Sequence, residues 1–340
     1  MKHVRLTGRS GRSLLAVLAL AALATLVLSS VTSAKSAAKK HVYLVTCEPN
    51  VFCHAYNAQL TKKLKAVGVS VTQLSDNFDP AMQDQHMNQA IAAKPDAILV
   101  FASNADAIVP ALKRAQAAHI PTVNLNARVK PAGEKYVTFE SIADNHALGR
   151  FAAMNLVEGM KAAGYSKGNV FLVTGTKGTL IVQDRLDEFY KYMKKYPQYK
   201  VVADQDGNWD QVKTSQLALQ IFSKYRAQGG IQGAYGMADY MAAGIIQAAD
   251  QLGIKTGVTK GSTVVTGSNC TPAGIPLMQQ KKLYGDATQS PIQEADTTAL
   301  VVTKFLNGQK VPHTTTVTEE RFTIKTLTPK FVNLCAKWPK

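Results

Sequence analysis

From residue 41 onward, short apolar runs alternate with longer segments in which apolar residues recur at helical spacing. This alternation predicts parallel strands joined by crossover helices. A first set has strands at 41–46, 69–74, 97–101 and 122–125 and helices at 56–67, 80–93 and 106–118. After 136–139 the alternation restarts, with helices at 144–162, 180–195, 210–225, 239–252, 272–280 and 292–306, strands at 169–174, 200–204, 232–235, 263–267 and 283–288, and a strand-like tail. Two such sets predict two doubly wound α/β lobes.

The first 34 residues have the composition of an export signal. A basic start (Lys2, Arg5, Arg9, Arg12) precedes an apolar run over 14–28, and small residues follow as far as Ala34. The run is shorter than the ~20 residues that a spanning helix needs, which favours a cleaved signal peptide over a retained membrane anchor. We therefore exclude residues 1–34 from the fold and expect a periplasmic or other extracytoplasmic location.

The chain is basic, but its charge pattern does not indicate nucleic-acid binding. Removing the four basic residues of the export signal lowers the formal net charge from +16 to +12. The remaining lysines are scattered in short groups, such as 62–65 and 191–195, without a basic run or a nucleic-acid motif. A basic solvated surface is expected, which also favours contact with anionic envelope lipids or an anionic ligand.

Four cysteines, Cys47, Cys53, Cys270 and Cys335, fall in the exported part of the chain. In an oxidising compartment they predict two structural disulfides, and three pairings are open at this point. Neither the close pair nor the distant pair has the spacing of a zinc knuckle, so no metal site is expected.

Motifs of the common enzyme classes are missing from the sequence. Residues 172–179 lie between a predicted strand and a helix, but they lack the spacing of a phosphate-binding loop. No dinucleotide fingerprint follows the first strand, and neither a nucleophile elbow nor a metalloprotease motif occurs. Neither catalysis nor a cofactor is expected.

Polar and aromatic residues follow several predicted strands, at the edge where ligands bind in open α/β sheets. Amide side chains can bond a polar ligand, and aromatic rings suit the apolar face of a sugar. Asp239 is also well placed to cap its helix, and we favour capping over ligand contact there. The candidates are Asn50 and Phe52 after the first strand, Asn126 and Arg128 after the fourth, and Trp209, Asp239 and Asn269 in the second set.

Three stretches of the sequence resemble one known family. Residues 141–149 (SIADNHALG) are similar to its D-N-x-x-x-G segment, 264–272 (VVTGSNCTP) to its V-V-G-F-D-G-T-P, and 120–126 (IPTVNLN) to its I-P-V-I-T-L-D. On these residues the chain resembles the ribose-type sugar-binding proteins of bacterial ABC importers, which have the type I periplasmic binding protein fold. The resemblance covers nearly all of the chain after the export signal.

The resemblance implies roles for individual residues. It assigns Asn50 and Phe52 to a ligand loop of the first lobe, Trp209 to stacking on a sugar ring, and Gln289 to the hinge. Gln183 falls where the family has a ligand-binding arginine, and Arg185 matches a second arginine of that segment. The chain departs from the family at Asn126 and Asn269, where the family has carboxylates. The family arginine that follows the first of these is Ala127 here, and Arg128 comes one place later. Ala238 replaces a family asparagine. Because a carboxylate accepts hydrogen bonds and an amide also donates them, we expect a ligand other than ribose, with carbonyl or anionic groups for Arg128 or Arg185.

The resemblance also implies the architecture and the function. Two lobes, 41–143 plus 290–319 and 144–289 plus 320–340, would be joined by three crossings near 143–144, 289–290 and 318–321. In this layout Cys47–Cys53 would staple the ligand loop, and Cys270–Cys335 would tie the tail to the second lobe. The implied protein is a monomeric, non-enzymatic solute-binding protein that delivers a carbohydrate or related solute to an ABC permease. The alternative is a sensing module for a chemoreceptor or sensor kinase.

Overall fold

The computed structural model describes residues 1, 3, 39–48, 50–336 and 338. The predicted export signal lies outside these residues apart from Met1 and His3. Within the described part, no helix combines the length and the apolar character needed to cross a bilayer. Residues 40–340 form one compact unit, and the fold below is that of this unit.

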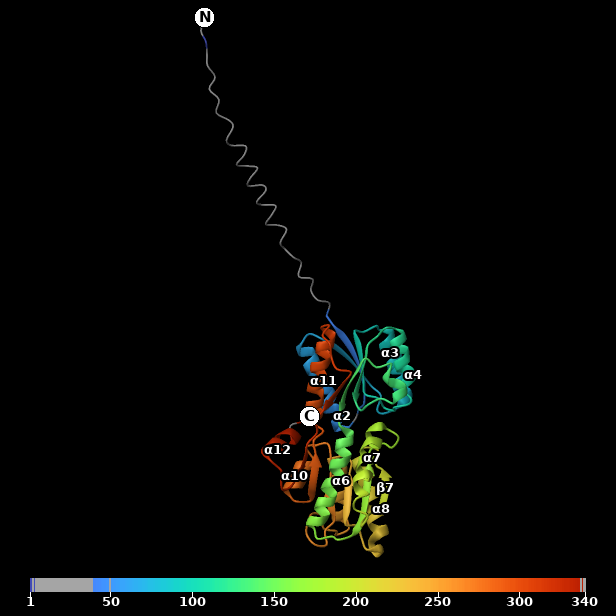
Figure 1. Cartoon of the computed structure of the whole chain (residues 1–340), viewed down its shortest axis with the longest axis vertical. Helices are drawn as coiled ribbons and strands as arrows, with labels where there is room; N and C mark the ends of the chain where they lie inside the picture. The colour runs from blue at the N-terminus through green and yellow to red at the C-terminus, as the bar shows by residue number, and fades with distance from the viewer. Residues whose placement is uncertain (2, 4–38, 49, 337, 339–340) are drawn as a thin grey trace. The chain divides into compact units, whose positions relative to one another are not determined.

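The first lobe is a six-stranded sheet with helices on both faces. Its strand order is β11-β5-β4-β3-β1-β2, and all pairs are parallel. Helices α2 and α11 lie on one side of this sheet and α3 and α4 on the other (Figure 1). The elements are β1 (His41–Thr46), α2 (Val51–Ala66), β2 (Ser70–Ser75), α3 (Pro80–Ala92), β3 (Ala97–Val100), α4 (Val109–Ala117), β4 (Thr122–Asn126), α5 (Pro131–Glu134), β5 (Phe139–Ala143), α11 (Pro291–Leu306) and β11 (Thr314–Val317).

The second lobe is a six-stranded sheet of the same design. Its order is β12-β10-β9-β8-β6-β7, with all pairs parallel except β10–β12. The elements are α6 (Asn145–Ala162), β6 (Gly168–Thr174), α7 (Leu180–Met193), β7 (Tyr199–Asp206), α8 (Gln211–Tyr225), β8 (Gly233–Gly236), α9 (Asp239–Gln251), β9 (Val264–Thr266), α10 (Gly274–Gln279), β10 (Leu283–Ala287), β12 (Arg321–Thr323) and α12 (Pro329–Ala336). The two sheets confirm the predicted pair of doubly wound lobes.

The chain passes between the two sheets three times, after β5, after β10 and between β11 and β12. One edge strand of each sheet, β11 or β12, therefore comes from the C-terminal part of the chain. The predicted strand-like tail is correct for β11 and β12 but wrong for the end, where α12 forms. Phe331 of α12 stacks on Phe322 of β12, with ring centroids 4.3 Å apart, and this contact holds the short helix on the second lobe.

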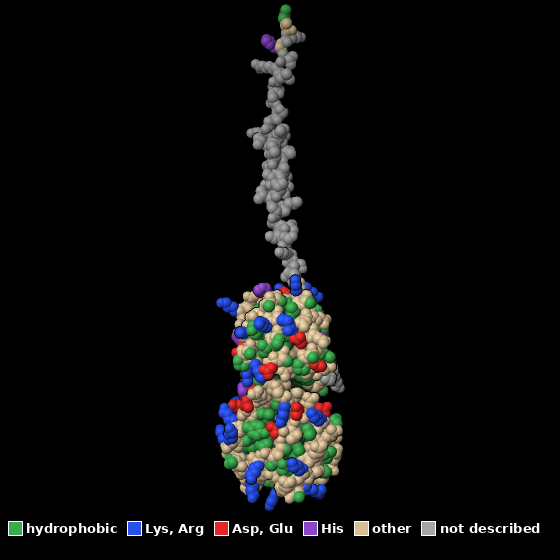
Figure 2. Space-filling view, turned by 90° about the vertical axis from the view of Figure 1, so that its right-hand side faces the viewer, with side chains coloured by type: hydrophobic (Ala, Val, Ile, Leu, Met, Phe, Trp, Pro, Cys, Tyr) green, Lys and Arg blue, Asp and Glu red, His purple; other side chains and the backbone are tan. Residues whose placement is uncertain are grey.

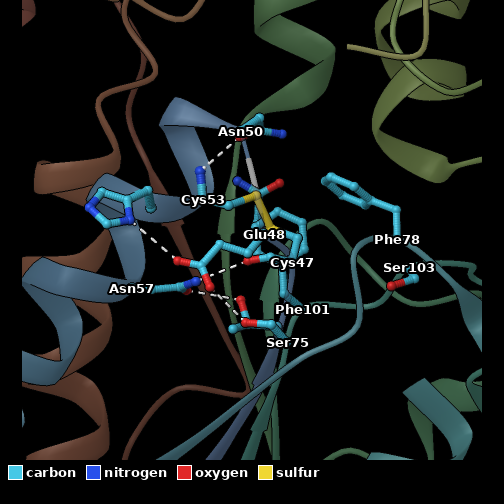
Figure 3. The surroundings of a disulfide bond; sticks show 12 residues. Cys47, Glu48, Asn50, Cys53, Asn57, Ser75, Phe78, Phe101 and Ser103 are labelled. Atoms are coloured by element: carbon cyan, nitrogen blue, oxygen red, sulfur yellow. Dashed lines mark hydrogen bonds and ion pairs between the residues drawn. A yellow bond between two sulfur atoms is a disulfide. The ribbon is translucent and has the colours of Figure 1, made fainter. Parts of the chain in front are cut away.

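The first helix begins five residues earlier than predicted. Asn50 caps α2, because its side-chain oxygen accepts a hydrogen bond from the backbone N–H of Cys53 at 2.9 Å. The cap brings Phe52 and Cys53 into the first turn of the helix. The Cys47–Cys53 disulfide then joins the end of β1 to this turn (Figure 3). Asn57, one turn further on, donates to the backbone oxygen of Cys47 at 2.9 Å, which ties the loop to the helix a second time.

The D-N-x-x-x-G segment has a structural explanation at the first crossing. Asp144 caps α6 by accepting from the N–H of Ala147 at 2.8 Å. Asn145 bonds the guanidinium of Arg185 at 2.9 Å. Gly149 lies so close to α7 that a Cβ on it would come within 2.0 Å of the backbone oxygen of Arg185. The segment therefore starts α6, bonds a buried arginine and allows α6 and α7 to pack together.

On the face drawn in Figure 2, basic side chains are spread out instead of forming one patch. In the view of Figure 2, lysine and arginine side chains lie among polar and acidic ones over both lobes. Many are paired with acids, for example Lys177 with Asp204 at 2.9 Å and Lys282 with Asp250 at 2.7 Å. This face offers no continuous basic track for a nucleic acid.

Substituting Gly149 by alanine should destabilise the second lobe. The added methyl group would force α6 away from the backbone of α7, at a cost of about 1–3 kcal/mol. Thermal unfolding should show a midpoint lower by several degrees. Ala162→Ser, which adds one atom at an exposed site of the same helix, is the control and should change the stability by less than about 0.5 kcal/mol. An unchanged midpoint for Gly149→Ala would contradict the close packing of α6 on α7.

Candidate functional site

One cavity of about 320 Å³ lies where the strand ends of both sheets meet, and residues of both lobes line it. Seven of the ten predicted ligand-binding residues line it: Asn50, Phe52, Asn126, Arg185, Trp209, Asn269 and Gln289. The remaining lining residues are Cys53, Phe78, Phe101, Ile181 and Tyr240.

Aromatic rings form much of the cavity wall. Phe52, Phe78 and Phe101 come from the first lobe, and Trp209 and Tyr240 from the second. Because rings are contributed from both sides, a flat apolar ligand surface placed in the cavity would touch both lobes.

The backbone is strained where two of these rings are held. Phe78 has a φ of 62° and Trp209 a φ of 55°, in the left-handed region that bulky residues rarely adopt. Such strain is tolerated where the surroundings fix it, and it is concentrated at functional sites. Gly175 helps to seat Trp209, since a Cβ at this position would lie 1.9 Å from the indole ring. Gly175 in the 172–179 segment therefore leaves space for the Trp209 ring in the cavity wall.

A buried guanidinium organises the polar side of the cavity. Arg185 is 1% exposed and donates from Nε to Asn145 at 2.9 Å and from Nη1 to the backbone oxygen of Met237 at 3.1 Å. It also donates to the side-chain oxygens of Asn269, at 2.9 Å, and Gln289. Burial lowers the pKa of Arg185 from its ordinary value. Among the described residues no carboxylate lies within ion-pair distance of Arg185, and none lines the cavity.

Three predicted ligand-binding residues lie outside the cavity. Arg128 instead makes a two-pronged ion pair with Asp184 of α7, at 2.8 and 3.0 Å, which joins the loop after β4 to the second lobe. This pairing raises the pKa of Arg128. Gln183 is exposed on α7. The third, Asp239, is fully buried.

The prediction that Asp239 caps its helix is wrong. Ala238 occupies the N-cap of α9, and the Asp239 carboxylate accepts from the N–H of Thr271 at 2.5 Å. Burial, together with the neighbouring Asp286, raises the pKa of Asp239 well above its ordinary value. Burial likewise raises the pKa of Asp286 to about 7. The two carboxyl groups therefore hold a proton inside the second lobe near the disulfide of Cys270.

Both predicted disulfides are present, Cys47–Cys53 and Cys270–Cys335. Each has both cysteines on one side of the interlobe cavity, in the layout that the resemblance implied. In the described part of the chain, no cluster of histidine, cysteine and acidic side chains is suited to hold a metal ion.

Five lining residues were not among the predicted ones. Phe101 directly follows β3 and Phe78 lies three residues after β2, so the rule that ligands bind at strand ends would have found them. Tyr240 lies in the first turn of α9 and Ile181 in that of α7, and their sequence neighbourhood gives no comparable signal. Cys53 reaches the cavity because the cap at Asn50 draws it into α2.

Two buried glutamates lie beside the hinge. Glu294 accepts from the amide of Asn126 at 2.8 Å, and Glu319, at the third crossing, accepts from the hydroxyl of Thr288 at 3.0 Å. Burial raises the pKa of Glu294 to about 7. Burial, reinforced by the nearby Glu294, raises the pKa of Glu319 to about 9. Glu319 is therefore protonated in the folded protein at neutral pH.

Glu319→Gln should remove a pH dependence of stability. An unfolded glutamate titrates near 4.5 and the folded Glu319 near 9, so the folded protein holds one more proton between these values. The free energy of unfolding then falls as the pH rises from about 4.5 to 9. Thermal unfolding at pH 5 and pH 8.5 should show a smaller decline for the variant, which gains about 1–3 kcal/mol at the higher pH. Glu320→Gln, at the exposed neighbouring position, is the control; an equal decline in Glu319→Gln and wild type would refute the assignment.

Comparison with known proteins agrees with this geometry. A family model described as "Periplasmic binding protein domain" matches residues 42–310. The chain is 25% identical over 286 residues to the ribose import binding protein of Escherichia coli (strain K12), covering 83% of this chain and 90% of that protein. It is 27% identical over 290 residues to the D-allose-binding periplasmic protein of the same organism, covering 83% and 89%. The crystal structure of a galactofuranose binding protein superposes with a TM-score of 0.79 at 18% identity, over 87% of this chain and 98% of that one.

Proposed function

The chain belongs to the family of periplasmic binding proteins, and from this premise we propose that it captures one sugar or sugar-like solute in the cavity between its lobes. The observation that carries the proposal is the composition of the cavity wall, where aromatic rings and side-chain amides from both lobes surround about 320 Å³. Rings suit the apolar face of a sugar, and amides bond its polar groups. The solute is bound and released without chemical change.

The free hydrogen-bonding groups of the cavity favour a ligand rich in acceptors. Asn50 uses its side-chain oxygen for the α2 cap and Asn269 uses its own for Arg185, so both present N–H groups. Arg185 donates four hydrogen bonds within the protein and also interacts with the buried hydroxyl of Tyr235, so its N–H groups are used within the protein. Asn126 donates to a buried carboxylate and presents its oxygen as an acceptor. Donors outnumber acceptors, and we infer a monosaccharide that carries a carboxylate or carbonyl group, such as a sugar acid.

Binding would favour closure of the lobes. A solute that contacts rings and amides of both lobes stabilises the arrangement in which they meet, by its difference in affinity for the two arrangements. The Arg128–Asp184 ion pair supports the closed arrangement, because it joins the loop after β4 to α7 beside the cavity.

The setting of this activity follows the family and the sequence. We place the protein outside the cytoplasm after removal of residues 1–34, as a monomer that hands its solute to an ABC permease. The lobes would comprise 41–143 plus 290–319 and 144–289 plus 320–340. Two disulfides support an oxidising compartment. Co-purification with a membrane sensor protein in place of a permease would favour the sensing alternative.

A thermal-shift screen tests the ligand class. The exported protein is heated with D-ribose, D-allose, polyols, nucleosides, amino acids and the sugar acids D-ribonate and D-galacturonate. A ligand at 100 times its Kd adds about 2.7 kcal/mol of apparent stability, which moves the midpoint by degrees. We expect the largest shift from a sugar acid. Micromolar binding of D-ribose in calorimetry would contradict the acceptor-rich ligand, and no shift from any sugar or sugar acid would contradict the function.

Trp209→Ala should weaken binding of the ligand found in that screen. Loss of a stacked ring from a buried apolar face costs roughly 1–3 kcal/mol, which is about 5- to 150-fold in Kd. Gly175→Ala should act in the same direction, because its methyl group displaces the indole that it faces. Trp209→Phe keeps a ring and should lose less. Calorimetry in which Trp209→Ala binds as tightly as wild type would refute the role of this wall.

A further inference from the structure

The second tryptophan of the chain lies against the cavity wall from behind. Trp338 follows α12 near the C-terminus, and its ring meets Phe52 edge-on, with centroids 6.0 Å apart and planes at 76°. Phe52 lines the cavity and is 6% exposed. Trp338 is partly buried and packs against the hydrophobic cluster of the first lobe. The Trp338 ring, which follows α12 of the second lobe, thus contacts the first lobe.

Covalent bonds fix both partners of this contact. Trp338 follows Cys335 by three residues, and Cys335 is bonded to Cys270, the direct neighbour of the cavity residue Asn269. Phe52 precedes Cys53, which is bonded to Cys47. The contact of Trp338 with Phe52 therefore connects a cavity wall of the first lobe to a cavity wall of the second.

The Cys270–Cys335 bridge and the stack of Phe331 on Phe322 both restrain the segment that carries Trp338. Terminal residues are poorly ordered unless they are tied down, and the eight-residue α12 is too short to be stable by itself. The bridge closes a sequence separation of 65 residues, which limits where the segment after α12 can reach. Phe52 has further aromatic support from Tyr56, at 6.4 Å and nearly parallel, so Trp338 supplies the edge-on contact from the other lobe.

We propose that Trp338 is a positioning residue for the Phe52 wall, and that the Cys270–Cys335 disulfide holds it there, so that breaking this bridge weakens solute binding without altering a residue of the cavity. The effect on affinity rests on the proposed function, whereas the placement of Trp338 does not. The Cys270–Cys335 bridge would then influence solute affinity although neither of its cysteines lines the cavity.

A ligand-free experiment tests the placement. The chain has two tryptophans, so Trp209→Phe leaves Trp338 as the only indole emitter. Acrylamide quenching of this variant should be weak and should increase at least about twofold when Cys270→Ser and Cys335→Ser are added. Phe52→Ala, which leaves the bridge intact, should also increase quenching. Circular dichroism checks that each variant is folded; if the cysteine variant is not, Phe52→Ala, which leaves both disulfides intact, provides the comparison. Equal quenching with and without the bridge, or with and without Phe52, overturns the proposal.

A second arm measures binding with D-ribose, D-ribonate and D-galacturonate as probes. For a probe that binds the unmodified protein, Trp338→Ala should raise Kd about 2- to 13-fold, the effect expected of one edge-on aromatic pair, and Trp338→Phe should restore most of it. In a Phe52→Ala background, Trp338→Ala should change Kd by less than twofold, since its partner is gone. A purely structural role would instead lower the melting temperature of Trp338→Ala and leave Kd unchanged, which overturns the positioning role. Failure of all three probes contradicts the proposed ligand class, and the quenching result still decides whether the bridge holds Trp338 against Phe52.

Discussion

The cavity face of the second lobe depends on one buried guanidinium. Arg185 of α7 bonds Asn145 at the first lobe crossing, Gln289 at the second, and Met237 and Asn269 at strand ends of the second lobe. A buried charge is tolerated only when its donors are satisfied, and removing one partner of such a group is far more costly than removing a surface contact. The second-lobe side of the cavity, the residues next to the first two crossings and the start of α6 are therefore linked by the same side chain.

The charge of Arg185 also shapes what surrounds it. Glu294 and Glu319 are the nearby acids, and their raised pKa values keep them wholly or partly protonated at neutral pH. The guanidinium is then solvated by amide and carbonyl oxygens instead of being neutralised by a carboxylate. Such a group retains a positive field in a low-dielectric cavity, where charge interactions are strong. An anionic solute would interact with this field favourably on binding.

The sequence predicted the lobes well because both depend on local pattern. Apolar runs predicted the strands and helical spacing the helices. The strand-end rule identified five of the twelve cavity residues, and the family resemblance added Arg185 and Gln289. The errors concern long-range partners. Arg128 pairs with Asp184, 56 positions along the chain, and Asp239 bonds Thr271, so neither orientation follows from neighbouring residues. The early start of α2 was missed because a local cap at Asn50 starts this helix ahead of its periodic pattern. The short α12 was missed because a ring packed on β12 stabilises it more than periodicity does.

The substitutions that separate this cavity from the pattern of the ribose-type family act together. An asparagine at 269 gives Arg185 an acceptor oxygen but no negative charge, and it turns an N–H group toward the cavity. At position 126 the asparagine donates to Glu294, so its oxygen is the end left for a ligand. The exchange at 269 leaves the guanidinium without a carboxylate partner, and both exchanges remove a negative charge that would accept sugar hydroxyls. Hydrogen bonding and electrostatics therefore favour the same kind of solute, one that brings its own negative oxygen atoms.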